Sequence, residues 1–263
     1  MAKFLTVKVD GPGIVVDAVL LTREGFAPFG DVIDNPRPDL HPSQAATTGG
    51  PLPHDGIVAN QGSAIKYQDV TRMVNLYDQA PSARPGVAVM NMFVCAARSL
   101  IPSPSGDFFA VRVLERHPYT TQTFIPLSVD PRKRFLVIVA PTLPPSPADE
   151  HLPVPSSPSE TQVLSGRALP GRGLPDLRRL RAFLATSEQA VTYGAGTWHA
   201  PMVAVGQAGT ALDFVVTQFA NAVGVEDCQE VFLEGQPDLS QDWRPERGVV
   251  VKVSRPGSTL AKL

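Results

Sequence analysis

The sequence predicts an all-β protein built mainly from antiparallel strands, with only a few short helices. Proline accounts for 27 of the 263 residues, roughly twice its usual share, and each interior proline costs a helix about 3 kcal/mol. Runs of β-compatible residues alternate with turns rich in glycine and proline, which is typical of an antiparallel sandwich or barrel. A chain of this length can form one large all-β domain or two small ones, and we expect one domain over residues 1–263.

The first third of the chain is predicted to contain short strands, one short helix and an exposed loop. Residues 7–33 are predicted to form strand, turn, helix and strand, with Thr22 as the helix cap. Residues 35–54 are rich in proline, glycine, serine and threonine, so we expect an exposed loop there. Residues 86–97 are mostly β-compatible, and we expect them to form a buried strand.

Later segments are predicted to supply most of the remaining strands. Asp176 can cap a short helix over residues 177–184, because Leu177, Leu180 and Leu184 recur at spacings of three and four. Strands are expected at residues 108–115, 135–140, 189–193, 201–205, 212–219, 228–233 and 249–253. Residues 141–175 are dense in proline and poor in aromatic residues, so they cannot build a core of their own. We expect a long loop or a partly disordered insertion between two strands.

Composition excludes several classes of function. A hydrophobic fraction of 43% with 18% charged residues and a net charge of −2 gives no reason to expect nucleic acid or a membrane surface as partner. No segment approaches the ~20 apolar residues of a membrane span, and the first residues lack the features of a signal or transit peptide. Cys95 and Cys228 show no metal or redox spacing and are best explained as small buried residues in a reducing compartment. We therefore expect a cytoplasmic protein.

Two segments carry the residues from which an active site could be built. Glu115 and His117 are one residue apart, so on a strand both side chains point to the same face, and Gln122 follows after four residues. About eighty residues later, a turn containing Gly196 leads to His199. These segments together offer two imidazoles, one carboxylate and one amide.

This arrangement resembles the two motifs of the cupin superfamily, His-x-His-x(3,4)-Glu and Gly-x-x-His, which meet inside a small antiparallel barrel. The positions are filled here by Glu115, His117, Gln122 and His199, so that one histidine is replaced by glutamate and the glutamate by glutamine. The resemblance implies a cupin-like β-barrel. It also implies a candidate divalent-metal site formed by the same four residues, which would accept Ni, Mn, Fe or Zn without specifying one.

A longer series of segments resembles the ureidoglycolate lyase family, including its fungal branch. The matching segments are LTREGFAPFGDVI, NQGSAIKY, ERHPYTTQTFIPL, RFLVIVAP, PDLRRLRAF, EQAVTYGAGTWHAP, DFVV and EDCQEV, in the family's order. The resemblance implies a homodimer that eliminates urea from ureidoglycolate and leaves glyoxylate in allantoin and purine breakdown. Two alternatives stay open from the residues: an amidohydrolase that releases ammonia from the same substrate, and a cupin that binds a small acid without turnover.

The chemistry of each candidate side chain suggests a role for it in the site. His117 and His199 are candidates for proton transfer, because the pKa of an imidazole lies near the working pH. Glu115 can orient an imidazole, act as a base if burial raises its pKa, or bind a metal. Gln122 offers two donors and an acceptor, and Tyr193 can hydrogen-bond substrate. A structural Glu-x-His pair satisfied by backbone groups is the alternative for the first motif.

An acidic substrate also requires positive charge in the site. Lys66 and Arg98 are the candidates for this charge, whereas strand alternation turns Arg116 away from Glu115. Asn60 precedes a glycine-containing loop that can bring backbone amides and Lys66 towards an anion. The alternative for this loop is a surface turn with a solvated lysine.

Overall fold

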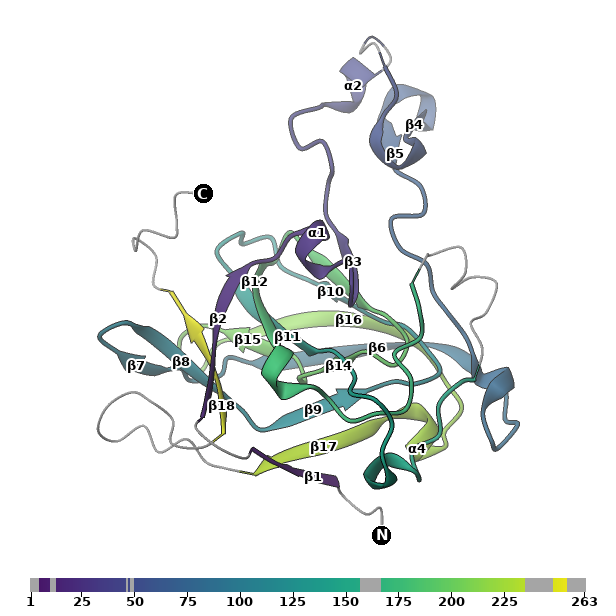
Figure 1. Cartoon of the computed structure of the whole chain (residues 1–263). Coiled ribbons are helices and arrows are strands. Elements are labelled where there is room, and N and C mark those ends of the chain that lie inside the picture. The colour runs from purple at the N-terminus through teal and green to yellow at the C-terminus, as the bar shows by residue number, and fades with distance from the viewer. Residues whose placement is uncertain are drawn as a thin grey trace.

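The computed structural model describes residues 5–9, 13–45, 47, 50–156, 167–234 and 248–254. Within these residues the protein is mainly β-strand with a few short helices, as predicted (Figure 1). The helices are single turns: α1 (Arg23–Phe26), α2 (Pro42–Ala45), α4 (Gly224–Asp227) and the 3-10 turns η1 (Pro53–Asp55), η2 (Asn60–Gly62), η3 (Tyr77–Gln79), η4 (Pro147–Asp149) and η5 (Leu177–Arg179). None of the described helices is long and apolar enough to cross a membrane.

The described strands form a large sheet, a five-stranded sheet and a two-stranded hairpin. The eleven-stranded sheet has the order β1 (Leu5–Lys8), β17 (Gln229–Glu234), β9 (Val113–Arg116), β14 (Trp198–His199), β11 (Arg134–Ala140), β12 (Arg181–Thr186), β2 (Ile14–Leu20), β18 (Val249–Val253), β8 (Gly106–Val111) and β7 (Ile101–Ser103), with β15 (Val203–Val205) paired to β11. The five-stranded sheet has the order β3 (Gly30–Ile33), β13 (Ala190–Tyr193), β10 (Gln122–Pro126), β16 (Ala211–Ala220) and β6 (Val87–Ala96). The hairpin joins β4 (Ile57–Ala59) to β5 (Ala64–Lys66). Most pairs are antiparallel, but β1 with β17 and β2 with both β12 and β18 are parallel.

The central strand β11 is buried on both faces, and its alternation separates two hydrophobic cores. Leu136 and Ile138 point into a core shared with β2, β8 and β18, whereas Val137 and Val139 point into a core shared with the five-stranded sheet. Because successive side chains on a strand point to opposite faces, one hydrophobic core lies on each side of β11. His199 pairs with Val139, so it faces the core beside the five-stranded sheet.

Strand β6 corrects one prediction, because residues 86–97 were expected to form a buried strand. The strand exists, but it is the last of its sheet, and the side chains of Met90, Met92 and Val94 are 72%, 59% and 69% exposed. Apolar composition predicts a strand but does not say which neighbours will cover it. Folded proteins commonly cover or charge an apolar edge strand of this kind.

The predicted helix over residues 177–184 is also wrong beyond its first turn. Asp176 does cap a turn, since its side chain accepts a hydrogen bond from the Arg178 amide, but η5 ends at Arg179 and the chain continues as β12. Strand β12 pairs with both β11 and β2. Tertiary pairing therefore overrides a short leucine periodicity that was compatible with a helix.

The ends of the proline-rich segment 141–175 are packed against the barrel. The Leu143 amide donates to the Leu174 carbonyl, and the Asp176 amide donates to the Pro141 carbonyl. Arg116 donates to the carbonyls of Gly171, Arg172 and Gly173. Residues 157–166, in the middle of this segment, lie outside the described residues. The prediction that the insertion is partly disordered falls on these residues.

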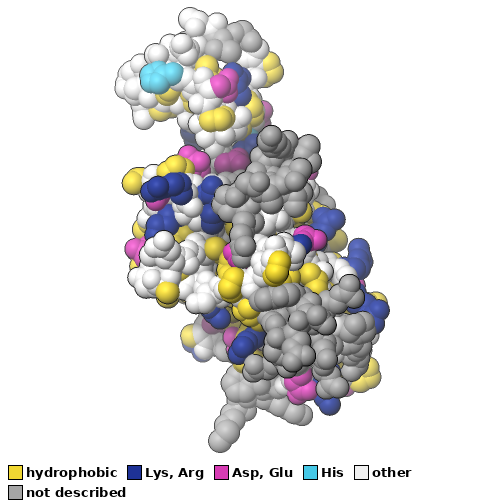
Figure 2. Space-filling model, turned by 90° about the vertical axis from the view of Figure 1, so that its left-hand side faces the viewer, with side chains coloured by type: hydrophobic (Ala, Val, Ile, Leu, Met, Phe, Trp, Pro, Cys, Tyr) yellow, Lys and Arg dark blue, Asp and Glu magenta, His cyan; other side chains and the backbone are white. Residues whose placement is uncertain are grey.

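One part of the chain stands clear of the barrel. We define the arm as the described residues between 35 and 69, which include α2 and the β4–β5 hairpin, and Figure 1 shows it extending away from both large sheets. Figure 2 shows the same part as a separate knob above the body of the molecule. The expected exposed loop over residues 35–54 thus lies in the arm, with α2 and η1 inside it.

Candidate active site

Glu115 and His199 lie opposite each other on the adjacent strands β9 and β14. Their backbones are paired in register, and the Oε1 atom of Glu115 lies 3.6 Å from Nε2 of His199. His117 follows the end of β9, and its ring centre lies 5.5 Å from that of His199. The two sequence segments predicted to supply the site therefore do meet.

The turn before His199 requires a glycine. Gly196 has φ = 76°, a left-handed conformation that costs other residues about 1–2 kcal/mol. Its amide donates to the His117 carbonyl at 2.8 Å, while the Thr197 amide donates to the Gly194 carbonyl. The turn thus ties the second segment to the first and sets the position of His199 relative to His117.

Both histidines are held in one tautomer. Nδ1 of His117 lies 2.6 Å from the Asp227 carbonyl, and Nδ1 of His199 lies 2.9 Å from the Thr197 carbonyl. Since a carbonyl can only accept, each Nδ1 carries the proton and each Nε2 is left with a free lone pair.

The two imidazoles are also held in the neutral form. Burial lowers the pKa of His117, and the Asp227 carbonyl and the Gln122 amide only partly offset this effect. Burial, reinforced by His117, lowers the pKa of His199 to about 3. Near neutral pH both Nε2 atoms are therefore acceptors and not donors.

Glu115 is the titratable group whose pKa matches neutral pH. Burial raises its pKa to about 7, the charge of Glu230 on the neighbouring strand adds to the shift, and the Cys228 thiol, whose sulfur lies 3.9 Å from Oε2, acts weakly against it. Among the described residues, no lysine or arginine forms an ion pair or a hydrogen bond with Glu115. Glu115 can therefore gain and lose a proton at working pH.

The facing wall of the site comes from the five-stranded sheet. Gln122 on β10 is paired with Tyr193 on β13 and Gln218 on β16, and its Nε2 donates to Oε1 of Gln218 at 2.7 Å. The Tyr193 ring stacks on the His199 ring with 4.0 Å between centres, and burial raises the pKa of its hydroxyl. The site thus lies between the two large sheets.

Four buried polar atoms of this site have no hydrogen-bond partner among the described residues. They are Nε2 of His117, Nε2 of His199, Oε1 of Gln122 and the hydroxyl of Tyr193. Buried polar groups in folded proteins are nearly always paired, with protein, water or ligand. Their convergence from two sheets is not the arrangement of a structural Glu-x-His pair whose polar groups are all satisfied.

The donor set also fits a divalent metal. Glu115, His117 and His199 can each direct one ligand atom into a space in which all three atoms lie within 4.8 Å of one another. Both Nε2 lone pairs are free because each Nδ1 donates to a backbone carbonyl, which is the usual arrangement of metal-bound histidine. Two imidazoles and a carboxylate suit Ni, Mn, Fe or Zn.

Three predicted binding residues lie elsewhere in the single chain. Asn60 and Lys66 are exposed on the arm. The Arg98 guanidinium lies 5.6 Å from the ring centre of Phe109, which belongs to the core on the other side of β11. Arg116 points away from Glu115, as strand alternation predicted, and lies over the Trp198 ring.

Sequence reasoning missed four residues that shape the site. Gln218 could have been found, because it continues the inward row of β16 after Phe214 and Val216 and is the polar member of that row. Asp227 contributes through its backbone carbonyl, which leaves no sequence signal. Cys228 and Glu230 lie beside Glu115 only because β17 pairs with β9.

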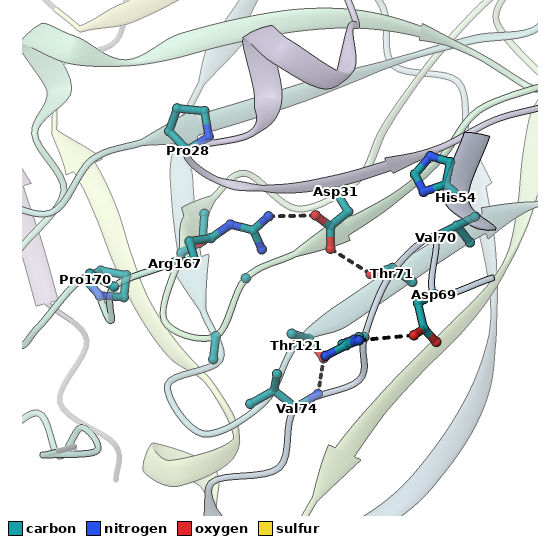
Figure 3. A pocket seen from close by; sticks show the side chains of 15 residues that line it. Pro28, Asp31, His54, Asp69, Val70, Thr71, Val74, Thr121, Arg167 and Pro170 are labelled. Atoms are coloured by element: carbon teal, nitrogen blue, oxygen red, sulfur yellow. Dashed lines mark hydrogen bonds and ion pairs between the residues drawn. The ribbon is translucent and has the colours of Figure 1, made fainter. Parts of the chain in front are cut away.

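A cavity of about 320 Å³ lies at the base of the arm (Figure 3). Asp31 accepts hydrogen bonds from Arg167 at 2.6 Å and Thr71 at 2.9 Å, and Arg72 pairs with Asp69. Asp31 is paired with Thr192, and alternation places both on the opposite face of the sheet from Tyr193. The cavity is thus separate from the histidine site, and both of its arginines are already paired with carboxylates.

Comparison with known proteins identifies the family. The model of the ureidoglycolate lyase family matches residues 14–239. The chain is 34% identical over 219 residues to a ureidoglycolate lyase of Schizosaccharomyces pombe, covering 81% of this chain and 88% of the relative. It is 31% identical to one of Saccharomyces cerevisiae, covering 77% and 85%, and 28% identical to one of Pseudomonas syringae pv. tomato, covering 87% and 95%. This chain therefore belongs to the ureidoglycolate lyase family.

Proposed function

We propose that this protein is a ureidoglycolate lyase that eliminates urea from ureidoglycolate and leaves glyoxylate. The names of its relatives support this activity. The observation that carries the proposal is the group of unpartnered acceptors beside a carboxylate with a pKa near 7. Ureidoglycolate carries a hydroxyl and three ureido N–H groups, so it presents the donors that these acceptors lack.

The reaction needs one proton moved over a short distance. Ionised Glu115 takes the hydroxyl proton, the oxygen forms the carbonyl of glyoxylate, and the bond from carbon to the ureido nitrogen breaks. The leaving ureido nitrogen is bonded to the same carbon as the hydroxyl, so protonated Glu115 can return the proton to this nitrogen. No water is consumed. Nε2 of His199, 3.6 Å from Glu115, can accept a ureido N–H bond and so keep the substrate hydroxyl beside the carboxylate.

The remaining groups bind the urea half of the substrate. Nε2 of His117 and Oε1 of Gln122 accept ureido N–H bonds, and the Tyr193 hydroxyl donates to the ureido carbonyl. A divalent metal held by Glu115, His117 and His199, with Gln122 beside them, would supply Lewis-acid polarisation of a substrate oxygen.

We also propose a single-domain, cytoplasmic enzyme of allantoin breakdown that works as a homodimer. The two hydrophobic cores share β11, which supports treating the described barrel as one folding unit. The exposed apolar strand β6 supports association with a second copy.

The test compares racemic ureidoglycolate turnover by the wild type with that of Glu115→Gln, His117→Ala and His199→Ala, each with and without a chelator. We expect release of urea and glyoxylate by the wild type and loss of at least about 100-fold in each variant. Glu188→Gln, an exposed glutamate in a turn, is the matched control and should retain activity. Wild-type release at the spontaneous rate would overturn the proposal.

A further inference from the structure

A cavity of about 620 Å³ lies where β11 ends and β12 begins. This volume is within the range of about 300–1,000 Å³ that is usual for small-molecule sites. Pro28 and Pro170, which Figure 3 shows at the cavity at the base of the arm, line both cavities. The two cavities therefore adjoin, but they differ in charge.

The 620 Å³ cavity contains two arginines without a carboxylate partner. Arg179 and Arg181 both line it, and both are exposed. The described residues offer neither guanidinium group an ion pair or a hydrogen bond, whereas both arginines of the adjoining cavity are paired with carboxylates. None of the described residues that line the 620 Å³ cavity is an aspartate or a glutamate. This cavity therefore carries positive charge that its own lining does not neutralise.

The local chain directs both guanidinium groups to the same side. Leu180, between the two arginines, is 5% exposed and packs in the core shared with β2, β8 and β18. Because successive side chains of an extended chain point to opposite sides, Arg179 and Arg181 both point away from that core. A guanidinium group binds a carboxylate through two parallel hydrogen bonds. Two such groups side by side suit an anion with two carboxylates.

The rest of the lining is mainly apolar and includes one unsatisfied hydroxyl. Phe29, Pro141 and Pro170 contribute apolar surface. Thr142 also lines the cavity, and its hydroxyl is buried without a hydrogen-bond partner among the described residues. An organic acid has a hydrocarbon part that can contact the apolar lining, whereas inorganic phosphate has none. The lining therefore favours an organic acid as the ligand.

The 620 Å³ cavity is a close neighbour of the active site. Val139 is paired with both Arg181 and His199, so the three side chains share one face of the sheet, with Arg181 two strands, or about 10 Å, from His199. Thr197 lines the cavity, and its carbonyl accepts the hydrogen bond from Nδ1 of His199. Its hydroxyl donates to the Phe29 carbonyl. A ligand in the cavity thus lies against the residue that fixes the tautomer of His199.

We propose that this cavity binds a small organic acid with two carboxylates, at a site separate from the one that acts on substrate. Arg179 and Arg181 each bind one carboxylate, and the bound acid packs against Thr197. Filling the cavity therefore changes the surroundings of His199 without contact to its ring. The binding of this acid does not rest on the proposed lyase activity.

A titration with succinate, followed by nuclear magnetic resonance, tests the proposal. The protein is metal-free and labelled with ¹⁵N in arginine and histidine, so that succinate has no metal to coordinate. We expect saturable shifts of the Arg179 and Arg181 Nε–H signals and of the His199 Nδ1–H signal, all with one Kd on the order of 1 mM, since the guanidinium groups are exposed to water. Arg179→Gln and Arg181→Gln should each raise this Kd about 10-fold.

Arg178→Gln is the matched control. Arg178 is an exposed arginine of the same turn but is not among the residues that line the cavity, so its replacement should leave the Kd unchanged. Equal weakening by Arg178→Gln would show general attraction to a basic segment and overturn the proposal. A His199 shift that keeps its Kd in Arg181→Gln would place succinate at the histidine site, which also overturns it.

A parallel titration with inorganic phosphate tests the class of ligand. Phosphate should bind more weakly than succinate, because it cannot use the apolar lining or reach both arginines with separate carboxylates. Phosphate binding as tight as that of succinate would reject the organic acid. Neither titration involves turnover, so an inactive protein that binds succinate at Arg179 and Arg181 would reject the proposed function and retain this site.

Discussion

Glu115 is a carboxylate whose ionisation is opposed by its surroundings. Its side chain is 18% exposed, and burial is the first cause of its raised pKa, followed by Glu230. The neutral imidazoles beside it cannot supply compensating charge. The same burial that prepares Glu115 for proton transfer therefore makes its charged form costly to the fold.

The pH dependence of activity follows from this pKa. Only ionised Glu115 can accept the hydroxyl proton, so kcat/KM should rise as the pH passes through about 7. Initial rates between pH 5 and pH 9 measure this rise. A rate that is already maximal at pH 5 would show that Glu115 is not the base.

The free energy of unfolding should fall with rising pH as Glu115 becomes ionised, whereas the activity should rise. Because the folded-state pKa of Glu115 is raised from 4.5 to about 7, the unfolded state ionises first, and stability is lost as the pH rises from about 4.5 to about 7. Glu115→Gln should therefore stabilise the metal-free protein by on the order of 3 kcal/mol at pH 8, and much less at pH 4. Urea unfolding at both pH values tests this, and equal effects would contradict it.

At the scale of elements, two turns hold the histidines. Gly196 begins the approach to His199, and the end of α4 presents the Asp227 carbonyl to His117. The Asp227 carboxylate is itself fixed by the Tyr77 hydroxyl at 2.7 Å and the Asn221 amide at 2.9 Å. The tautomer of His117 thus depends on a contact made by a residue in η3.

Gly196→Ala should reduce both stability and activity. The left-handed φ of 76° predicts a cost of about 1–2 kcal/mol, and any shift of the turn moves His199 away from Glu115. Gly209→Ala is the matched control, because Gly209 has φ = 84° and open space around it. It should lose similar stability in thermal unfolding but keep its kcat. Equal loss of kcat in both variants would contradict the role given to the Gly196 turn.

Tyr77→Phe should weaken the positioning of His117. Removing one hydrogen bond to the partly buried Asp227 carboxylate costs about 1–3 kcal/mol, and we expect kcat to fall several-fold while the fold is retained. Steady-state kinetics and circular dichroism together measure this effect. Unchanged kcat with reduced stability would show that the Tyr77 contact supports the loop but not the catalytic geometry.

At the scale of the whole molecule, the exposed β6 face predicts association. Met92→Asp places a charge at the edge-strand end of the apolar row formed with Val215 and Ile125, so it should shift the protein to monomers. Light scattering after size exclusion measures the mass directly. Lys252→Asp, on β18 of the other sheet, is the control and should leave the mass unchanged. A dimeric Met92→Asp protein would place the interface elsewhere.

Much of this architecture could be predicted from the sequence, because it depends on local patterns. Alternation predicted that Glu115 and His117 face one way and Arg116 the other, and the glycine-containing turn predicted the approach to His199. The environment of β6, the pairing that turns residues 181–186 into a strand, and the position of Glu230 beside Glu115 depend on contacts between distant segments. These contacts follow from the global fold and not from any local sequence pattern.

The stoichiometry of the products tests the central claim most directly. Purified wild-type protein should convert ureidoglycolate to urea and glyoxylate in equal amounts, faster than the spontaneous reaction, with no ammonia. This result would show that the bond from carbon to the ureido nitrogen is broken without hydrolysis of the ureido group. Ammonia in place of urea would contradict the lyase assignment and identify an amidohydrolase built on the same barrel.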